Sequence, residues 1–301
     1  MIKPDAEIAR TKDRVFVLPD GRNLGYRELG DPQGTPVIAL HGTPGSRLKY
    51  SGSHEAAARA GLRLIALDRW GYGLSSDKRG GQIEDYAYDV TALVNSLGIG
   101  RFQITGVSGG GPFAVATAAA LGDRVTALAL VSPVGLIAGT DGCAKLSPLH
   151  SLCFRILPRV PGALFAIFHG QRLGLAVAPN LAMSIAVSRS AQSDQEAMRK
   201  PEIRARMIEN FASGLQPGVA GAVGDMALFG RPWGIDFSGV RAATRIWIGV
   251  CDLNVPLTAV RALSAALPGC ELIEIPSAGH LWIAEHAHVV MDWLAERAAI
   301  P

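Results

Sequence analysis

Short apolar runs recur along most of the chain. Runs of roughly 4–8 residues with few polar members are typical of strands buried on both faces of a sheet. We predict such strands at residues 36–40, 62–68, 102–107, 125–132, 244–250 and 271–276. Residues 14–18 and 23–29 instead alternate apolar and polar side chains around a turn at 19–21, which predicts a hairpin.

Between these runs, apolar residues recur at helical spacing. We predict helices at residues 55–60, 83–98, 112–122, 256–267 and 281–298. Glycine closes two of these stretches, at Gly61 and Gly98, and glycine is a common residue at a helix end. Repeated strand–helix units predict an α/β fold, with a mostly parallel sheet and helices on both of its faces.

Residues 136–232 interrupt the alternation. They are helix-rich, are punctuated by proline and contain no clear buried strand. We therefore predict a core domain of residues 1–135 and 233–301, with residues 136–232 as an inserted helical cap, or lid.

The first part of this insertion, residues 142–193, contains no Asp or Glu. Its basic residues are Lys145, Arg155, Arg159, Arg172 and Arg189. Three interpretations stay open. The apolar faces pack on each other and on the core, or they form a lid over a pocket that accepts neutral or anionic ligands, or they lie on a membrane surface.

Composition excludes several classes of partner. The chain has 301 residues, enough for one large α/β domain with an insertion. The net charge is +3 and the basic residues are scattered, so we expect no nucleic-acid binding. No uncharged apolar stretch reaches the roughly 18 residues of a membrane-spanning helix. The first residues lack an apolar core typical of a signal peptide, and we expect a cytoplasmic protein.

The cysteines and histidines show no metal-binding spacing. Cys143, Cys153, Cys251 and Cys270 form no C-x-x-C pair, and we expect free, mostly buried thiols. We predict no metal and no cofactor. The sequence leaves the oligomeric state open, a homodimer included.

One glycine-rich turn stands between a predicted strand and a predicted helix, in residues 104–115 (ITGVSGGGPFAV). A dinucleotide-binding turn would need glycine at Ser108, and a phosphate-binding P-loop would need lysine before its final Ser or Thr; both patterns fail. The pattern G-x-S-x-G fits at Gly106, Ser108 and Gly110. Such a turn strains the serine backbone and lifts its side chain above the sheet, as a nucleophile requires.

A nucleophilic serine needs a base and an acid that orients the base. His280 and Asp252 each follow a predicted strand, at the sheet edge where catalytic groups gather in such folds. His286 and His288 fall inside a predicted helix, and we interpret them as packed or solvated. The chain order Ser108, Asp252, His280 is the order expected for one serine-hydrolase architecture.

The loop after the strand at 36–40 supplies a further element. Gly42 and its neighbours make a tight turn that can aim a backbone N–H at the site. We predict an oxyanion hole formed by the N–H groups of Thr43 and Gly109. We expect His41 to brace this loop rather than to carry protons.

With these motifs the chain resembles the α/β-hydrolase fold family, in its capped serine-hydrolase branch. The matching segments are residues 41–46, 68–75, 106–112, 249–256 and 278–281. The resemblance implies an eight-stranded sheet with a helical cap entered after strand 6. The family often has proline at the position of Trp70 and a larger residue at the position of Gly109. We expect Trp70, Leu281 and Trp282 to line the pocket, and the bare wall at Gly109 to be filled by the cap or by substrate.

These motifs favour hydrolysis of a carboxylic ester or lactone with an apolar acyl part, a small-molecule substrate, through an acyl-enzyme on Ser108. We expect activity to fall below about pH 6.5, as His280 gains a proton. Two alternatives use the same triad. One is a hydrolase of carbon–carbon bonds in vinylogous diketones, whose anionic substrate the cap arginines would bind.

The other alternative is an iminopeptidase-like hydrolase that holds its substrate amine with later cap acids. The candidates are Asp194, Glu196, Glu202, Glu209 and Asp225. Haloalkane dehalogenase and epoxide hydrolase chemistry is disfavoured, because relatives of those types carry aspartate where Ser108 stands. A catalytically silent ligand receptor on the same fold is the non-enzymatic alternative.

Overall fold

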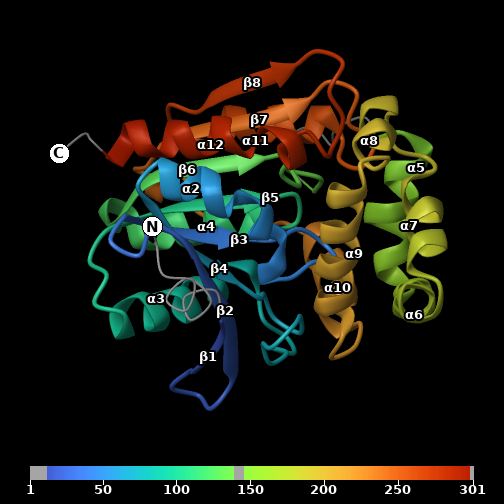
Figure 1. The fold of residues 1–301 in the computed structure, drawn as a ribbon, viewed down its shortest axis with the longest axis horizontal. Helices are drawn as coiled ribbons and strands as arrows, with labels where there is room; N and C mark the ends of the chain where they lie inside the picture. The colour runs from blue at the N-terminus through green and yellow to red at the C-terminus, as the bar shows by residue number, and fades with distance from the viewer. Residues whose placement is uncertain (1–11, 139–145, 299–301) are drawn as a thin grey trace.

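A computed structural model describes residues 12–138 and 146–298, and Cys143 and Lys145 lie outside these ranges. Figure 1 shows the strands gathered into one sheet. The strands are β1 (Asp13–Val17), β2 (Asn23–Gly30), β3 (Thr35–Leu40), β4 (Leu62–Leu67), β5 (Phe102–Val107), β6 (Val125–Val131), β7 (Ala243–Gly249) and β8 (Glu271–Ile275). The sheet order is β1-β2-β4-β3-β5-β6-β7-β8. The pairs β1·β2 and β2·β4 are antiparallel and all others are parallel, as the alternation of elements predicts.

The core helices are α2 (His54–Arg59), α3 (Tyr86–Ser96), α4 (Gly110–Leu121), α11 (Leu257–Ala266) and α12 (Ile283–Ala298). The helices between β6 and β7 are α5 (Pro148–Ser151), α6 (Pro161–Val177), α7 (Pro179–Val187), α8 (Gln192–Ala197), α9 (Pro201–Leu215) and α10 (Ala220–Phe229). Short 3₁₀ helices and one π-helical segment, η4, complete them: η1 (Arg47–Ser53), η2 (Ile83–Asp85), η3 (Gly122–Arg124), η4 (Leu152–Ile156), η5 (Leu157–Arg159) and η6 (Phe237–Gly239).

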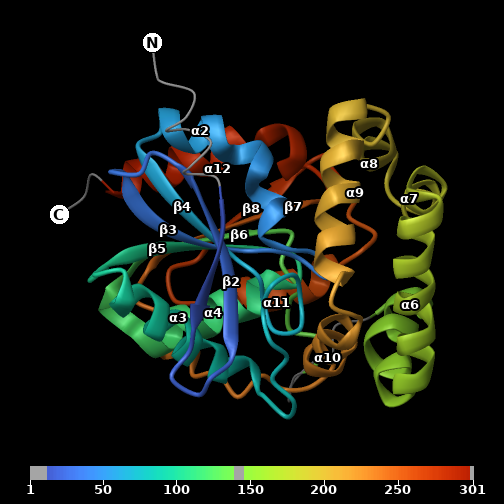
Figure 2. The ribbon, with the colours of Figure 1, turned by 60° about the horizontal axis from the view of Figure 1, so that its bottom comes forward.

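The sheet is sandwiched between two helical layers. Helices α2 and α12 cover one face, and α3, α4 and α11 cover the other (Figure 2). Alternate side chains of a strand enter opposite layers. In β3, Val37 and Ala39 pack in the α2–α12 layer, while Ile38 and Leu40 pack in the other. This two-sided burial explains why the central strands are solidly apolar.

The last strand differs from the prediction of a buried strand. No residue of β8 is fully buried, because β8 pairs only with β7 and forms one edge of the sheet. Glu271 and Glu274 of β8 form ion pairs with Arg245 and Arg261, and such charged pairs are suited to a strand edge that is exposed to solvent. The apolar run therefore marked a strand correctly but overstated its burial.

The inserted helices stand together at one end of the sheet (Figures 1 and 2). We call α5–α10 the cap, and we keep its boundaries at 136 and 232 as a prediction. Its inner side packs around buried Met183, Met198 and Met207, and this cluster includes Tyr72 and Leu281 of the core. The cap is thus packed onto the sheet end.

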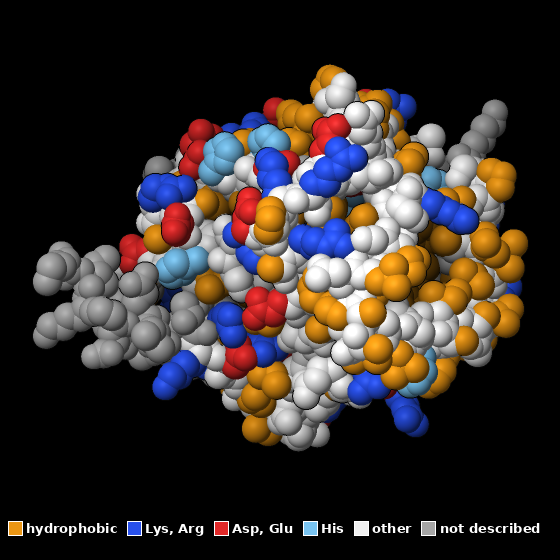
Figure 3. Space-filling view, turned by 45° about the vertical axis from the view of Figure 1, so that its right-hand side comes forward, with side chains coloured by type: hydrophobic (Ala, Val, Ile, Leu, Met, Phe, Trp, Pro, Cys, Tyr) orange, Lys and Arg blue, Asp and Glu red, His pale blue; other side chains and the backbone are white. Residues whose placement is uncertain are grey.

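The outer side of the cap is apolar as well. Its exposed large apolar side chains are Leu149, Leu152, Ile156, Val160, Phe165, Ile167, Leu173, Val177, Leu181 and Ile185. Figure 3, with the cap side turned forward, shows apolar side chains gathered over this surface. The interpretation that these faces pack inward therefore holds for the inner side of α6 and α7, where Leu164, Leu175 and Met183 are buried, and is wrong for the exposed outer side.

No single helix in the described ranges has both the length and the apolar composition to cross a membrane. The pair Pro148–Arg159 and Pro161–Val177 meets the same criteria jointly, with a bend of 112° between its two parts.

Candidate active site

The predicted site residues follow four parallel strands. Thr43 follows β3, Ser108 follows β5, Asp252 follows β7 and His280 follows β8. Because parallel strands place their carboxyl ends at one edge of a sheet, these residues come to the same edge. The cap stands at that edge.

The turn at Ser108 has the strained backbone that its sequence predicts. Ser108 has φ of +52°, in the left-handed region that L-residues seldom occupy. Its carbonyl oxygen accepts hydrogen bonds from the N–H groups of Gly111 and Val134, which hold this conformation. A Cβ at Gly106 would lie 2.7 Å from the carbonyl oxygen of Gly110, so this turn requires a residue without a side chain.

The two predicted oxyanion-hole donors are free to bind a ligand. Neither the Thr43 N–H nor the Gly109 N–H has an acceptor within residues 12–138 and 146–298. A Cβ on Gly109 would collide with the Thr43 hydroxyl and would lie 2.9 Å from the ring of Phe229. The bare wall at Gly109 is therefore filled by Thr43 and by the cap helix α10.

His280 and Asp252 form a hydrogen-bonded pair. His280 Nδ1 lies 2.7 Å from Asp252 Oδ2, and the Asp252 side chain has no exposed surface. The other oxygen, Oδ1, accepts the N–H groups of Asn254 and Val255, which fixes the carboxylate. Burial by itself lowers the pKa of His280, but the Asp252 carboxylate outweighs it and leaves that pKa raised above 6.5. The imidazole is thus oriented with Nε2 left for another partner.

Ser108 and His280 line the same cavity, which measures about 310 Å³. Among the described residues the Ser108 hydroxyl has no hydrogen-bond partner, and catalytic contacts of this kind often tighten only when substrate is bound.

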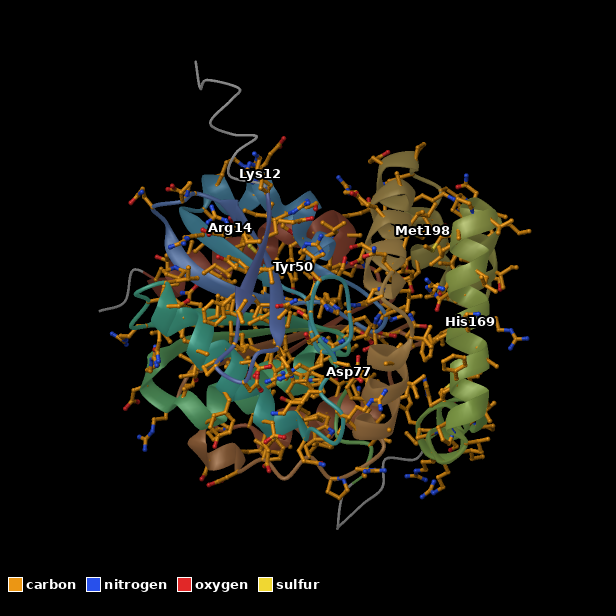
Figure 4. All side chains as sticks on the ribbon, turned by 90° about the horizontal axis from the view of Figure 1, so that it is seen from below. Lys12, Arg14, Tyr50, Asp77, His169 and Met198 are labelled. Carbon is orange, nitrogen blue, oxygen red and sulfur yellow. The ribbon has the colours of Figure 1, made fainter. Side chains whose placement is uncertain are left out.

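The other histidines lie elsewhere. His150 contacts Ser147 and the carbonyl oxygen of Leu253. His169 on α6 stacks on Phe165 and points away from the core (Figure 4). His286 lies at a kink in α12 and stacks on Trp282. None of these lines the cavity that contains Ser108.

His41 is fully buried and is held as a neutral ring. Its Nε2 accepts the N–H of Arg69, so the ring proton is on Nδ1, which donates to the carbonyl oxygen of Gly42. Burial, together with the positive charge of Arg69, lowers the pKa of His41 well below 6.5. This geometry suits a brace for the loop that carries Thr43.

A buried ion pair between Arg69, which follows β4, and Asp225 of α10 joins the core to the cap, and the sequence did not reveal it. Arg69 Nη1 donates to Asp225 Oδ1 at 2.7 Å, and both side chains are almost fully buried. Asp225 Oδ2 accepts the hydroxyl protons of Thr43 and Tyr72, at 2.5 and 2.6 Å. Asp225 is the only charged residue in the apolar helix α10, a pattern that could have marked it as buried and paired.

A second cap carboxylate holds the histidine loop. Asp194 of α8 accepts the N–H groups of His280 and Leu281, at 3.0 and 2.7 Å. Burial raises the pKa of Asp194, although these two N–H groups oppose the shift. A side chain at Gly279 would collide with this carboxylate. Two cap acids therefore fix the two loops that flank Ser108.

The cavity wall is mostly apolar and comes from both cap and core. Its lining residues are Gly42, Thr43, Pro44, Lys49, Val107, Ser108, Val134, Cys153, Phe154, Gln171, Met183, Ala186, Val187, Ser190, Met207, Asn210, Phe211, Met226, Phe229, Asn254, Val255, His280, Leu281 and Ile283. Leu281 is among them, as predicted, and no Asp or Glu is.

Two predicted lining residues lie elsewhere. Trp70 is buried against Tyr86 and Phe113, and its indole N–H donates to Asp89 at 2.6 Å, so it faces the core. Trp282 lines a separate hollow on the other side of the histidine loop. Aromatic and hydrogen-bond partners hold Trp70 in the core, and stacking on His286 holds Trp282 outside the cavity.

The charged cap residues also stay outside the cavity. Of the predicted cations, Arg172 donates to the carbonyl oxygens of Leu215 and Gln216, and none of the described cap arginines lines the wall. Among the described cysteines, Cys153 lines the cavity and Cys251 is exposed, contrary to the expectation of burial. Within the described residues no cluster of three or more His, Cys, Asp or Glu side chains could hold a metal ion.

Residues 35–152 match the model of the α/β-hydrolase fold. The chain is 27% identical over 295 residues to haloalkane dehalogenase 2 of Mycobacterium tuberculosis, covering 92% of this chain and 91% of the relative. It is 28% identical over 289 residues to a 2-hydroxymuconate semialdehyde hydrolase of Pseudomonas putida, covering 92% and 93%.

Other matches are partial or more distant. The acetyltransferase component of an acetoin-cleaving system of Pseudomonas putida is 34% identical over 123 residues, which cover 40% of this chain and only 33% of that relative. A non-heme chloroperoxidase of Streptomyces lividans likewise matches over only 42% of its length. The crystal structure of the enol-lactonase of Burkholderia xenovorans LB400 superposes with a TM-score of 0.68 at 21% identity, covering 95% of this chain and 99% of that one.

Proposed function

Because this chain belongs to the α/β-hydrolase fold family, we propose that it is a serine hydrolase that cleaves a carboxylic ester or lactone with an apolar acyl part. One observation carries the proposal. A serine on a strained turn and a hydrogen-bonded His–Asp pair line one mostly apolar cavity, whose wall contains no carboxylate.

In the proposed mechanism His280 Nε2 takes the proton of Ser108 Oγ as that oxygen attacks the substrate carbonyl carbon. Asp252 holds the imidazole in the required tautomer and stabilises its cation. The N–H groups of Thr43 and Gly109 stabilise the oxyanion, and each such donor can contribute on the order of 3 kcal/mol. Water, activated by His280, then releases the acid from the acyl-enzyme.

Cleavage of carbon–carbon bonds is the second candidate. The similarity to 2-hydroxymuconate semialdehyde hydrolase along almost the whole chain favours it. It would use the same triad, but the cap arginines that we expected to bind its anionic substrate do not line the cavity.

The iminopeptidase alternative loses its main support. Asp194 and Asp225 are both occupied by hydrogen bonds within the protein, and no cap acid among the described residues lines the cavity. The wall offers the positive charge of Lys49, which would repel a substrate ammonium group. Dehalogenase chemistry stays disfavoured in spite of the sequence similarity, because a serine stands at position 108.

We expect the purified protein to hydrolyse aryl esters and lactones in a series of increasing acyl length, with kcat/KM rising until the apolar cavity is filled. Parallel assays with a vinylogous 1,5-diketone test the second candidate. Turnover of the diketone but of no ester or lactone would overturn the ester proposal. Saturable ester binding without turnover would favour the silent receptor instead.

The pH dependence provides a separate test of His280. Because its pKa in the folded protein is raised above 6.5, the free base is lost as pH falls through that raised value. We expect kcat/KM for a neutral ester to reach half its plateau above pH 6.5, so the decline begins at higher pH than the value of about 6.5 predicted from the sequence. Asp252→Asn should move the midpoint to lower pH. A profile that stays flat down to about pH 5 would exclude His280 as the base.

A further inference from the structure

One charged side chain in the cavity wall has no partner. Lys49 lies in η1, directly after the loop that carries Thr43, and it lines both the cavity and a smaller adjoining hollow. Within the described residues its ammonium group makes no hydrogen bond and no ion pair. Tyr50, the next residue, also lines the smaller hollow, but its hydroxyl donates to the carbonyl oxygen of Leu40.

The lack of a partner distinguishes the partly buried Lys49 from the two buried arginines near the site. Arg47 is paired with Asp13 and Asp68, and Arg69 is paired with Asp225. Around Lys49, the charged or titratable groups that line the two hollows are Tyr50, Cys153, Arg206 and His280, and none of them is a carboxylate. Burial, and then the positive charge of Arg206, lower the pKa of Lys49 to about 8.

A second unused donor lines the same two hollows. Asn210 of α9 is 2% exposed, and its Oδ1 accepts the N–H of Ser46 at 2.8 Å. Because the amide oxygen faces Ser46, the NH₂ group lies on the opposite side, where no described residue accepts from it. Asn210 and Lys49 thus offer two kinds of N–H donor to whatever occupies the cavity.

We propose that Lys49 and Asn210 form a subsite for a carboxylate carried by the substrate, in the same cavity as the bond that is cleaved but separate from it. A carboxylate has two acceptor oxygens, so it can accept one hydrogen bond from Lys49 and one from Asn210. It would also neutralise the ammonium group in a mostly apolar wall, which an apolar acyl chain alone leaves desolvated. This inference rests on the proposed function: the substrate is an ester or lactone that carries an acid group.

The occupied subsite would also act on the catalytic base. The positive charge of Lys49 lowers the pKa of His280, whereas Asp252 and Asp194 raise it. A carboxylate bound to Lys49 removes the repulsion between the two cations. Bound acid substrates should therefore stabilise the His280 cation that forms during attack by Ser108.

A matched pair of substrates tests the subsite. Mono-4-nitrophenyl octanedioate and 4-nitrophenyl octanoate have the same chain length and differ in one terminal carboxylate. We expect Lys49→Met to lower the ratio of their kcat/KM values about 10- to 100-fold, mainly through KM of the acid ester. Lys49→Arg should restore most of the ratio. In the unchanged protein the ratio should decline above pH 8, as Lys49 loses its proton.

Arg189→Met is the matched control, because Arg189 is an exposed cap cation that does not line the cavity. It should leave the ratio unchanged. Equal effects of Lys49→Met on both esters, or an equal loss of the ratio in Arg189→Met, would overturn the proposal.

A binding measurement separates this proposal from the proposed function. Octanoate is titrated calorimetrically into the Ser108→Ala protein, with octanamide as the neutral comparison. Octanoate should bind more tightly than octanamide, and Lys49→Met or Lys49→Gln should remove that difference even if no ester is ever cleaved. Equal binding of octanoate and octanamide, or a preference that persists in both Lys49 variants, would overturn the subsite.

Discussion

Replacing Ser108 with alanine should lower kcat by about 10⁴-fold or more, with the folded structure retained. The hydroxyl is the proposed nucleophile, and removing it leaves only binding and oxyanion stabilisation to assist water. Alanine has the same Cβ as serine, so the strained turn at φ +52° need not change. The measurements are kcat on the best ester of the series and labelling with a fluorophosphonate probe, followed by peptide mass spectrometry.

The matched control is Ser132→Ala. Ser132 also has positive φ, +42°, but its hydroxyl is buried, has no partner and lies outside the cavity. This variant should keep both turnover and labelling. His280→Ala should lose labelling although Ser108 is present, because the serine is then no longer deprotonated. Turnover that survives in Ser108→Ala would assign the chemistry to another group.

Replacing Asp225 with alanine should lower the free energy of unfolding by about 3–5 kcal/mol, because it leaves the buried Arg69 guanidinium without its carboxylate. Thr43 and Tyr72 lose their acceptor at the same time. Urea denaturation measures the change, provided that the transition is two-state.

Two further variants distinguish the cost of leaving Arg69 without its carboxylate from the effect of removing any cap carboxylate. In Arg69→Met/Asp225→Leu no charge is stranded, so the double variant should be more stable than Asp225→Ala. Glu196→Ala removes an exposed cap carboxylate that, among the described residues, accepts a hydrogen bond from Gln192 alone, and should change stability by no more than about 0.5 kcal/mol. A loss of about 1 kcal/mol or less in Asp225→Ala would mean that Arg69 reaches water when its partner is removed.

Asp194 and Asp225 of the cap hydrogen-bond to residues of the proposed catalytic machinery. Asp225 fixes the hydroxyl of Thr43, beside one proposed oxyanion donor, and Asp194 fixes the backbone of the proposed base. The cap therefore does more than cover an apolar cavity. It completes the hydrogen bonds of two loops that the core leaves unsatisfied, so movement of the cap would disturb both loops.

The local pattern of apolar and polar residues was sufficient to predict the arrangement of strands and helices. The alternation of apolar runs and helical spacing predicted the parallel sheet with helices on both faces, because strands buried on two sides can contain few polar residues. The turn at Ser108 could also be predicted from the sequence, because its strain is local and crowding excludes a side chain at Gly106. The order of Ser108, Asp252 and His280 indicated one edge of the sheet, where the structure gathers them.

Only the tertiary structure decided how charged and aromatic side chains are used. Among the five acids of the cap's second half, sequence spacing did not single out Asp194 and Asp225, whose partners lie more than 80 positions away in the chain. Nor did it indicate that Trp70 turns into the core, that β8 forms an edge, or that Lys49 stays unpaired. The physical reason is common to all four. Burial of a polar or aromatic group is determined by the partners it meets in space, and a local pattern contains no record of contacts between distant segments.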